Sequence, residues 1–167
     1  MFKVFLGLGS NLGDRIDHLT KAVKEIGLIG VINSLSSVYE TEPVGFESDQ
    51  LFYNMVLNIT TVFRPPELLK KIKQIEKNIG RKRSTAYLQD REIDIDILLY
   101  HGFSYEDADV RVPHPGLEYR RFVLEPFNEI APTAIHPILS QTIATLLRNC
   151  RDRSRVMRTR YVLNFEI

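Results

Sequence analysis

The sequence predicts an α+β fold with a ferredoxin-like βαββαβ core, an antiparallel sheet, and helical and short-strand additions toward the C-terminus. Two observations predict the core. Runs with strand composition or alternation lie at 2–8, 31–39, 52–63 and 93–99. Two segments with apolar residues at helical spacing separate the first strand from the second and the third from the fourth. In this order both helices cover one face of the sheet, and the other face is left free for a ligand.

Both predicted helices have recognisable ends. The first ends at Gly27 and follows a tight turn at 9–14, which offers three capping residues, Ser10, Asn11 and Asp14. The second begins at Pro65, because proline is favoured in a first turn, and Gly80 closes it. After residue 100 the pattern is less regular and predicts a short strand at 110–112, helices at 115–129 and 141–149, and a strand within 155–165.

Length and composition indicate one globular domain over 1–167. The chain is 44% hydrophobic and 26% charged with a formal net charge of +1, so no global basic field favours nucleic acid or an anionic membrane. No segment has the apolar length of a membrane span or the pattern of a signal peptide. Cys150 is the only cysteine, which excludes an intrachain disulfide. A reducing cytoplasm fits these features.

An arginine-rich C-terminal extension from about residue 151 departs from this charge balance. Between 148 and 160 there are arginines at six positions, against a single acidic residue, Asp152. A patch that binds polyanions and a solvated basic face both fit this pattern, and the solvated face is the more common outcome.

The strand at 93–99 carries the strongest chemical signal. Asp94 and Asp96 alternate with isoleucines, so their carboxylates point to one face of the strand while the isoleucines point into a core. Like charges this close repel, and one pKa rises unless a cation lies between them. With arginines just upstream, the pattern favours a site for phosphate and a divalent cation. A strand with one solvated polar face, or cross-strand Asp–Arg pairs, would give the same pattern.

Three other kinds of site are excluded. The run Gly7–Gly13 has Leu12 where a dinucleotide-binding fingerprint needs glycine, and there is no Walker loop. Aspartates that alternate with isoleucines do not form a calcium loop of the EF-hand kind. Two carboxylates plus substrate phosphates are instead the usual ligands of Mg²⁺.

Two further motifs indicate ligand binding. Phe52 and Asn54 share one face of the strand 52–63, where a ring can stack on a planar heterocycle and an amide can bond its edge. A core aromatic residue beside a turn-facing Asn is the structural alternative. His114 lies between two prolines and six residues before Arg120, and both side chains could contact phosphate oxygens, although a lone His is more often structural.

Taken together, these motifs resemble the 6-hydroxymethyl-7,8-dihydropterin pyrophosphokinases of folate biosynthesis. The resemblance covers about residues 3–135. It rests on motifs in the family's order: Gly9-Ser10-Asn11-Leu12-Gly13, Tyr39-x-Thr41-x-Pro43-x-Gly45, Phe52-x-Asn54, Pro66-x-x-Leu69, Ile75-Glu76-x-x-x-Gly80-Arg81-x-Arg83, Arg91-x-x-Asp94-Ile95-Asp96-Ile97-Leu98, Val112-Pro113-His114-Pro115, and Arg120-x-Phe122-Val123-Leu124-x-Pro126 with Glu129-Ile130-Ala131-Pro132. It implies a kinase of the diphosphate type, which moves the β,γ-diphosphate of ATP to the pterin hydroxymethyl group and releases AMP.

The resemblance also implies roles for single residues. Two Mg²⁺ ions would bind to Asp94 and Asp96 and bridge the ATP phosphates and the acceptor oxygen. The pterin would be held by five residues, through two rings, an amide and two backbone groups: Phe52, Phe122, Asn54, Thr41 and Val44. Six positions match those around ATP: Glu76, Arg81, Arg83, Arg91, His114 and Arg120. No side chain is an obvious general base, so Arg81, Arg91 and the two aspartates would catalyse by positioning and electrostatics.

The chain departs from the family's pattern in two places. Leu88 and Asp90 stand where the family commonly has Trp and a small residue or Pro, and Tyr87 is a candidate for the missing ring. Asp109 and Arg111 stand where an Arg and a small polar residue are familiar near the adenine.

The polar loop 82–90 lacks apolar anchors, so we expect it to be mobile without ligand and to close over ATP.

The expected partners are ATP and the pterin, with no nucleic acid and no membrane. We expect the protein to be a monomer or a weak homodimer. Two alternatives remain open from the residues alone. One is a ligand- or RNA-binding ferredoxin-like module without catalysis, although the strands lack the aromatic signature expected of RNA-recognition modules. The other is a two-metal phosphatase or nuclease on the same aspartates.

Overall fold

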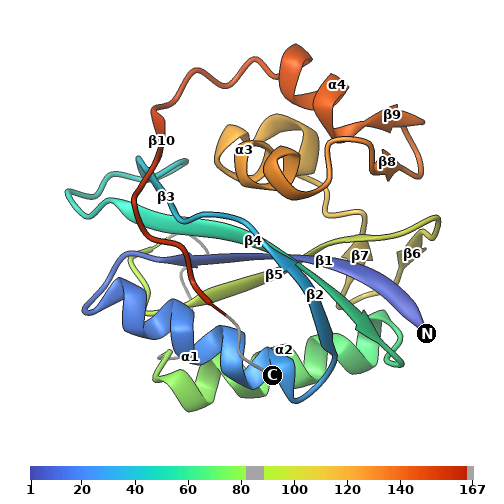
Figure 1. Cartoon of the computed structure of the whole chain (residues 1–167), viewed down its shortest axis with the longest axis horizontal. Coiled ribbons are helices and arrows are strands. Elements are labelled where there is room, and N and C mark those ends of the chain that lie inside the picture. The colour runs from blue at the N-terminus through green and yellow to red at the C-terminus, as the bar shows by residue number, and fades with distance from the viewer. Residues whose placement is uncertain (82–88, 165–167) are drawn as a thin grey trace.

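The computed structural model of the protein describes residues 1–81 and 89–164. These residues form three layers, in which a six-stranded sheet lies between the helices α1 and α2 and the helices α3 and α4 (Figure 1). None of the helices in the described ranges is long and apolar enough to cross a membrane.

The sheet is antiparallel throughout, in the order β10-β3-β4-β1-β5, with β2 also paired to β4. Its strands are β1 (Phe2–Ser10), β2 (Val31–Leu35), β3 (Tyr39–Thr41), β4 (Phe52–Thr61), β5 (Asp94–Tyr100) and β10 (Val156–Arg158). The strands before and after the first helix, β1 and β2, are therefore not neighbours in the sheet, because β1 pairs with β4 on one side and with β5 on the other. This arrangement confirms the predicted ferredoxin-like core.

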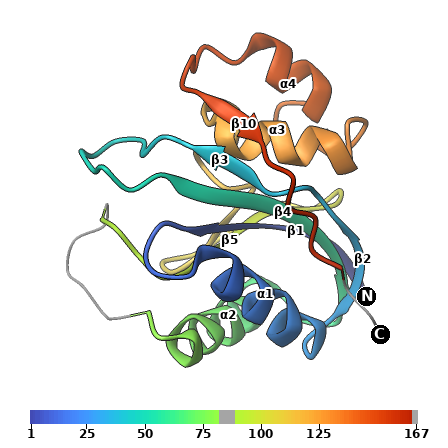
Figure 2. The same ribbon diagram turned by 60° about the vertical axis from the view of Figure 1, so that its left-hand side comes forward.

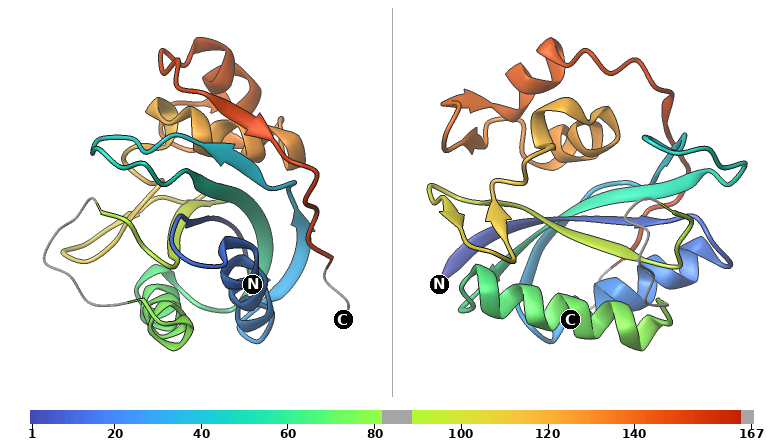
Figure 3. Two further views of the ribbon diagram at one scale, coloured as in Figure 1. Left: turned by 90° about the vertical axis from the view of Figure 1, so that its left-hand side faces the viewer. Right: turned by 180° about the vertical axis from the view of Figure 1, so that it is seen from behind.

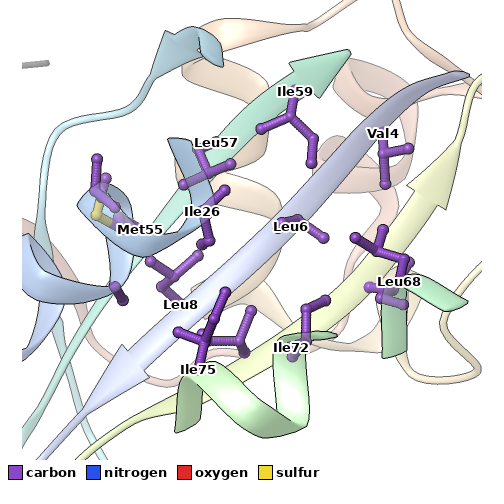
Figure 4. Packing of buried hydrophobic residues seen from close by; sticks show 14 of the residues in the cluster. Val4, Leu6, Leu8, Ile26, Met55, Leu57, Ile59, Leu68, Ile72 and Ile75 are labelled. Carbon is purple, nitrogen blue, oxygen red and sulfur yellow. The ribbon is translucent and has the colours of Figure 1, made fainter. Parts of the chain in front are cut away.

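The helices α1 (Arg15–Gly27) and α2 (Pro65–Ile79) cover one face of the sheet (Figure 2). Asp14 caps α1 by accepting a hydrogen bond from the backbone N–H of Asp17 at 3.0 Å, and Gly80 ends α2 with a left-handed φ of 111°. The main core lies between these helices and the sheet (Figure 4). It includes Val4, Leu6 and Leu8 of β1, Leu57 and Ile59 of β4, Ile26 of α1, and Leu68, Ile72 and Ile75 of α2.

The opposite face of the sheet is only partly open, which corrects the prediction of a free face. Phe5, Val56 and Leu98 point to this side and pack against Leu124 and Phe127 of α3 (Arg121–Ile130). The rings of Phe5 and Phe127 lie 4.6 Å apart between centroids. The helix α4 (Ile143–Asn149) packs on α3 and completes this third layer (Figure 3). A second core therefore fills one part of this face and leaves the other part for a cavity.

Short elements connect the layers. They are the hairpin of β6 (Tyr105–Glu106) and β7 (Arg111–Val112), the hairpin of β8 (Ile135–His136) and β9 (Gln141–Thr142), and a 3₁₀ turn at Leu117–Tyr119. The single helix predicted over 115–129 is therefore a 3₁₀ turn followed by α3, and the strand predicted within 155–165 is restricted to β10.

The strand predicted over 31–39 is two strands, because the chain bends at 36–38. At Ser36 the side chain takes part in the pairing with β4. Its Oγ accepts a hydrogen bond of 2.9 Å from the backbone N–H of Val56, and its backbone N–H donates to the carbonyl of Val56 at 2.9 Å. The chain then returns to β4 as β3. Similarly β1 continues through Ser10, so the predicted turn begins only after that residue.

Candidate active site

A cavity of about 500 Å³ opens on the sheet face that α3 covers only in part. Its floor comes from β1, β4 and β5, and its walls come from the loop that follows β3 and from the start of α3. The lining includes most of the residues that the sequence assigned to ligands, namely Thr41, Val44, Phe52, Asn54, Arg81, Arg91, Asp94, Asp96, Arg120 and Phe122. These residues lie far apart in the sequence, and the fold brings them around one space.

Glycines in β1 leave the floor of this cavity without side chains. Gly7 and Gly9 both line the cavity, as expected for alternate residues of one strand. A Cβ atom at Gly9 would lie 2.6 Å from Oδ1 of Asn54, so any side chain at this position would force the amide of Asn54 to shift. The chain therefore needs glycine at position 9 so that the amide of Asn54 can lie against β1.

One end of the cavity, here called the aromatic end, carries rings and an amide. Asn54 is 8% exposed and its Nδ2 donates a hydrogen bond of 2.7 Å to Oγ1 of Thr41. Phe52 is buried, with the ring of Phe46 edge-on at 6.2 Å, and Phe122 lies at the start of α3. Aromatic rings beside one fixed amide suit a planar heterocycle with polar edges.

The other end, here called the acidic end, carries Asp94 and Asp96 on β5. The isoleucines at 93, 95 and 97 are buried in the main core, so the predicted division of this strand into two faces is correct. Burial and the neighbouring charge of Asp94 raise the pKa of Asp96 to about 7, although Arg120 and Arg91 oppose this rise. Two close carboxylates, one of them partly protonated at neutral pH, make a site where a cation would be stabilised.

Arginines already neutralise Asp94. Its Oδ1 accepts a hydrogen bond of 2.7 Å from Nη1 of Arg81, and its Oδ2 lies 3.3 Å from Nη1 of Arg91. The same Nη1 of Arg81 also donates to Glu76. Any cation that binds Asp94 must therefore share this carboxylate with the arginines or displace them.

Glu76 of α2 holds Arg81 and the start of β5 in place. Its side chain is 3% exposed, and its carboxylate accepts hydrogen bonds from the backbone N–H of Ile95 at 2.9 Å and from Lys73 at 3.0 Å. It does not line the cavity, so it affects the acidic end through Arg81 and through β5. A carboxylate so well satisfied fixes the guanidinium that it holds.

Arg91 is held through its backbone. Its N–H donates to Oδ1 of Asn11 at 2.7 Å, and its carbonyl accepts from the backbone N–H of Asn11 at 3.1 Å. Nδ2 of Asn11 also donates to Asp90 at 2.7 Å. Within the part of the chain that the structure describes, Nε of Arg91 is buried and has no hydrogen-bond partner.

His114 lies behind the acidic end and does not line the cavity. Burial and the positive charge of Arg120 lower the pKa of His114 to about 4, so the ring is neutral at physiological pH. Its Nδ1 accepts a hydrogen bond of 3.0 Å from the N–H of Gly116, which places the ring proton on Nε2. His114 can thus act as a neutral hydrogen-bond donor but not as a cation.

Several features of the site lay outside the sequence interpretation. Lys73 of α2 and Phe46 of the loop after β3 line the cavity, and Asn11 connects the turn after β1 to Arg91. Two of these features had a signal in the sequence. Lys73 lies three residues before Glu76, a spacing that places both side chains on one face of a helix. Alternate glycines in a strand, here Gly7 and Gly9, indicate that another group approaches the backbone closely.

Arg83 and Tyr87 lie outside the described residues, as does most of the predicted lid loop. Asp90, a departure from the family's pattern, binds Asn11, and Arg111 lies 3.7 Å from Glu106.

The fold and the cavity define an α+β protein in which rings and an amide share one cavity with clustered carboxylates and guanidinium groups, and phosphoryl-transfer enzymes use such charged clusters. Residues 5–132 match the model of the family described as 7,8-dihydro-6-hydroxymethylpterin-pyrophosphokinase (HPPK). The chain belongs to this family.

Curated relatives agree with this assignment. The chain is 47% identical over 138 residues to a 2-amino-4-hydroxy-6-hydroxymethyldihydropteridine pyrophosphokinase of Aquifex aeolicus, which covers 83% of this chain and 86% of the relative. It is 41% identical over 128 residues to the protein of the same name from Bacillus subtilis, which covers 75% of this chain and 76% of the relative.

Solved structures share the fold. A crystal structure of Plasmodium falciparum HPPK-DHPS superposes with a TM-score of 0.71 at 18% identity, over 88% of this chain. The chain spans 44% of the length of that protein. This similarity concerns the fold alone.

Proposed function

We propose that the protein transfers the β,γ-diphosphate of ATP to the hydroxymethyl group of 6-hydroxymethyl-7,8-dihydropterin, with AMP as the second product, and that the cavity is its active site. One observation carries the assignment of the site. The aromatic end and the acidic end belong to one continuous cavity, so a ring bound at one end can present a hydroxyl group to phosphates bound at the other. The activity itself is that of the family to which the chain belongs.

At the aromatic end, the pterin lies between Phe52 and Phe122. Asn54 bonds its amide edge, and backbone groups of Thr41 and Val44 bond the rest of that edge. The hydrogen bond from Asn54 to Thr41 supports this role, because it fixes the amide before the ligand arrives. The ring of Phe52 lines the cavity and supplies the stacking surface, although the guanidinium of Arg91 now lies over this ring at 5.6 Å from its centroid and must make room for the pterin.

At the acidic end, ATP binds with two Mg²⁺ ions held by Asp94 and Asp96. The donor set fits Mg²⁺, which prefers carboxylate and phosphate oxygens with water. Among the described residues no three His, Cys, Asp or Glu side chains lie close enough to hold an ion by themselves, which supports phosphates as the remaining ligands. The bound ions supply charge neutralisation for the phosphates and for the acceptor oxygen.

The protein's own residues position the phosphates. Arg81, Arg91 and Arg120 line the cavity and stabilise negative charge on the diphosphate as it transfers. By the family's motif we also assign to ATP both Arg83 and His114, a neutral Nε2 donor that does not itself line the cavity. Glu76 contributes by holding Arg81. In this proposal Asp94 and Asp96 serve as metal ligands, and catalysis is mainly positioning and electrostatics.

The direct test is to incubate the protein with the pterin, ATP and Mg²⁺ and to measure AMP. Asp96→Ala should lower the rate by about a thousandfold or more, since it removes a ligand of the metal ions. Asp17→Ala is the matched control: this aspartate lies on α1, across the sheet, and its exposed carboxylate forms an ion pair with Lys21.

Undiminished AMP release from Asp96→Ala would refute the metal assignment. Release of inorganic phosphate in place of AMP would indicate a phosphatase on the same aspartates. We further propose that residues 1–167 act as one catalytic domain, as a monomer or weak homodimer, in the cytoplasm. Sedimentation at catalytic concentrations measures the oligomeric state.

A further inference from the structure

The C-terminal segment 155–163, here called the strap, lies beyond the residues that match the family model, which end at 132. It runs from α4 across the edge of the sheet, where β10 adds a strand beside β3 (Figures 1 and 3). Its register is regular, with Val156 opposite Thr41 and Arg158 opposite Tyr39. The strap therefore covers what would otherwise be the edge strand of the sheet.

The strap is fastened just beyond the C-terminal end of β10. The backbone N–H of Thr159 donates to the carbonyl of Val38 at 2.9 Å, and the N–H of Val38 donates to the carbonyl of Tyr161 at 3.1 Å. The Thr159 hydroxyl donates to the same Val38 carbonyl at 2.8 Å. Further along, Leu163 packs against the main core. These contacts fix the strap along the residues that immediately precede β3.

Arg158 ties the strap to α3 as well. Its Nε donates to Oγ of Ser37 at 2.9 Å and its Nη2 to Glu129 at 3.2 Å. Glu129 also accepts from the backbone N–H and the hydroxyl of Ser37, and from the hydroxyl of Tyr39 at 2.9 Å. Burial and Glu129 raise the pKa of Tyr39 to about 12, so its hydroxyl remains a donor at neutral pH. One carboxylate thus joins the strap, β3 and α3.

The residues held in this way lead directly into the aromatic end of the cavity. β3 has only three residues, and its last one, Thr41, accepts the hydrogen bond that fixes Asn54. The next residue, Glu42, lines the cavity and accepts from the backbone N–H of Arg155 at 3.3 Å. A strand this short is not stable alone at an edge, so its position depends on the neighbour on each side.

We propose that the strap positions the pterin-binding wall of the cavity, with Arg158 and Thr159 as positioning residues that act through β3 and Thr41. The inference rests on the proposed function, because it concerns the site for the pterin. It gives the arginine-rich extension a specific role: one arginine, Arg158, fastens the strap. The strap should therefore affect binding of the pterin more than binding of ATP, whose site lies at the opposite end of the cavity.

Two variants of the full chain test the strap. Thr159→Pro removes the N–H and the hydroxyl that bind Val38, and Arg158→Ala removes the contacts to Ser37 and Glu129. Arg153→Ala is the matched control, because Arg153 lies in the same arginine-rich segment and makes no side-chain hydrogen bond or ion pair with a described residue. Binding is measured by titrating 6-hydroxymethylpterin in the presence of α,β-methylene ATP and Mg²⁺, and by titrating the nucleotide alone.

We expect Thr159→Pro to weaken pterin binding by about tenfold and Arg158→Ala by about threefold, since Arg158 is more than half exposed. Binding of the nucleotide should stay within about twofold of the wild type in both variants, and Arg153→Ala should change neither. Hydrogen exchange of the amides at 39–41 should accelerate in both strap variants, which shows that β3 has been released.

A purely structural strap would lower the melting temperature without this selective loss. Faster exchange at 39–41 with unchanged pterin affinity would overturn the proposal, and so would an equal loss of both ligands. If Thr159→Pro does not fold, the same comparison in Arg158→Ala decides. Failure of the proposed function is a separate result, because the wild type would then neither bind pterin nor form AMP while exchange at 39–41 still reports on the strap.

Discussion

At the scale of single residues, the site depends as much on missing side chains as on the groups that touch ligands. Gly9 allows Asn54 to lie against β1, and Asn54 in turn is fixed by Thr41. Sequence alone predicts that Asn54 and Phe52 share a face, since residues two apart in a strand do so. It could not predict that a glycine of another strand lies beneath the amide, because that proximity depends on the register of β1 against β4.

Gly9→Ala tests this contact. The added methyl group would meet Oδ1 of Asn54 at 2.6 Å, so the amide must move and lose its alignment with the pterin edge. We expect pterin affinity to fall by about tenfold or more, while nucleotide affinity changes little. Calorimetric titration of each ligand measures both values.

Gly7→Ala is the graded comparison for this substitution. Its Cβ would lie 3.3 Å from the flexible side chain of Leu98, which can yield by a few tenths of an ångström. It should therefore have the smaller effect on pterin affinity. An equal or larger loss in Gly7→Ala would show that filling the floor, and not the displacement of Asn54, limits binding.

At the scale of elements, the sequence predicted the core strands and helices in their order. The alternation of Asp94 and Asp96 with isoleucines predicted the two faces of β5, because both faces are set by local periodicity. The predictions that failed concerned features set by contacts between segments that are distant in the chain. The break between β2 and β3 depends on Ser36 binding the backbone of β4, and the partial closure of the sheet face depends on α3.

The role of α3 in the site leads to a prediction. Its Phe127 packs on Phe5 of β1, and its first turn carries Phe122 beside the cavity. Phe127→Ala should destabilise the protein by about 3 to 5 kcal/mol through loss of buried surface and the cavity left behind. We also expect weaker pterin binding, since Phe122 would no longer be held in place. Denaturant unfolding and pterin titration measure the two effects.

Ile130→Ala serves as a control at the far end of the same helix, where the side chain is only partly buried. It should cost less stability and leave pterin affinity unchanged. If Phe127→Ala retained wild-type pterin affinity despite its loss of stability, α3 would be a support for the fold and would have no role in shaping the aromatic end.

At the scale of the whole molecule, the acidic end reduces the stability of the fold without ligand. The pKa of Asp96 is raised to about 7 by burial and by Asp94, so the folded protein resists ionisation of a group that ionises near 3.8 when unfolded. Its contribution to stability is therefore greatest at low pH and falls as pH rises from about 4 to 7. The upper limit of this loss is about 4 kcal/mol.

Asp96→Asn should remove that loss. In the absence of nucleotide and metal ions we expect the variant to be more stable than the wild type at pH 8, by about 1 to 3 kcal/mol, and nearly equal to it near pH 3. His114, whose lowered pKa makes the protein less stable as pH falls from 6.5 toward 4, is present in both proteins and cancels in the difference.

The check is denaturant unfolding of both proteins across this pH range. A gain in stability that does not change with pH would mean that Asp96 is already ionised in the folded protein. Asp96→Asn should also be inactive, because the carboxylate that lowers the stability of the free protein is the one proposed to hold the metal ions.

The sequence by itself determined the family, the order of the core elements and the residue types of the site, because these follow from local periodicity and from motifs in a fixed order. Only the tertiary structure decided how those residues meet. The pairing of Asp94 with Arg81 and Arg91, the support of Asn54 by Gly9 and Thr41, and the strap across β3 all join segments that are distant in the chain. Such contacts depend on sheet register and on packing between layers, which local sequence patterns do not specify.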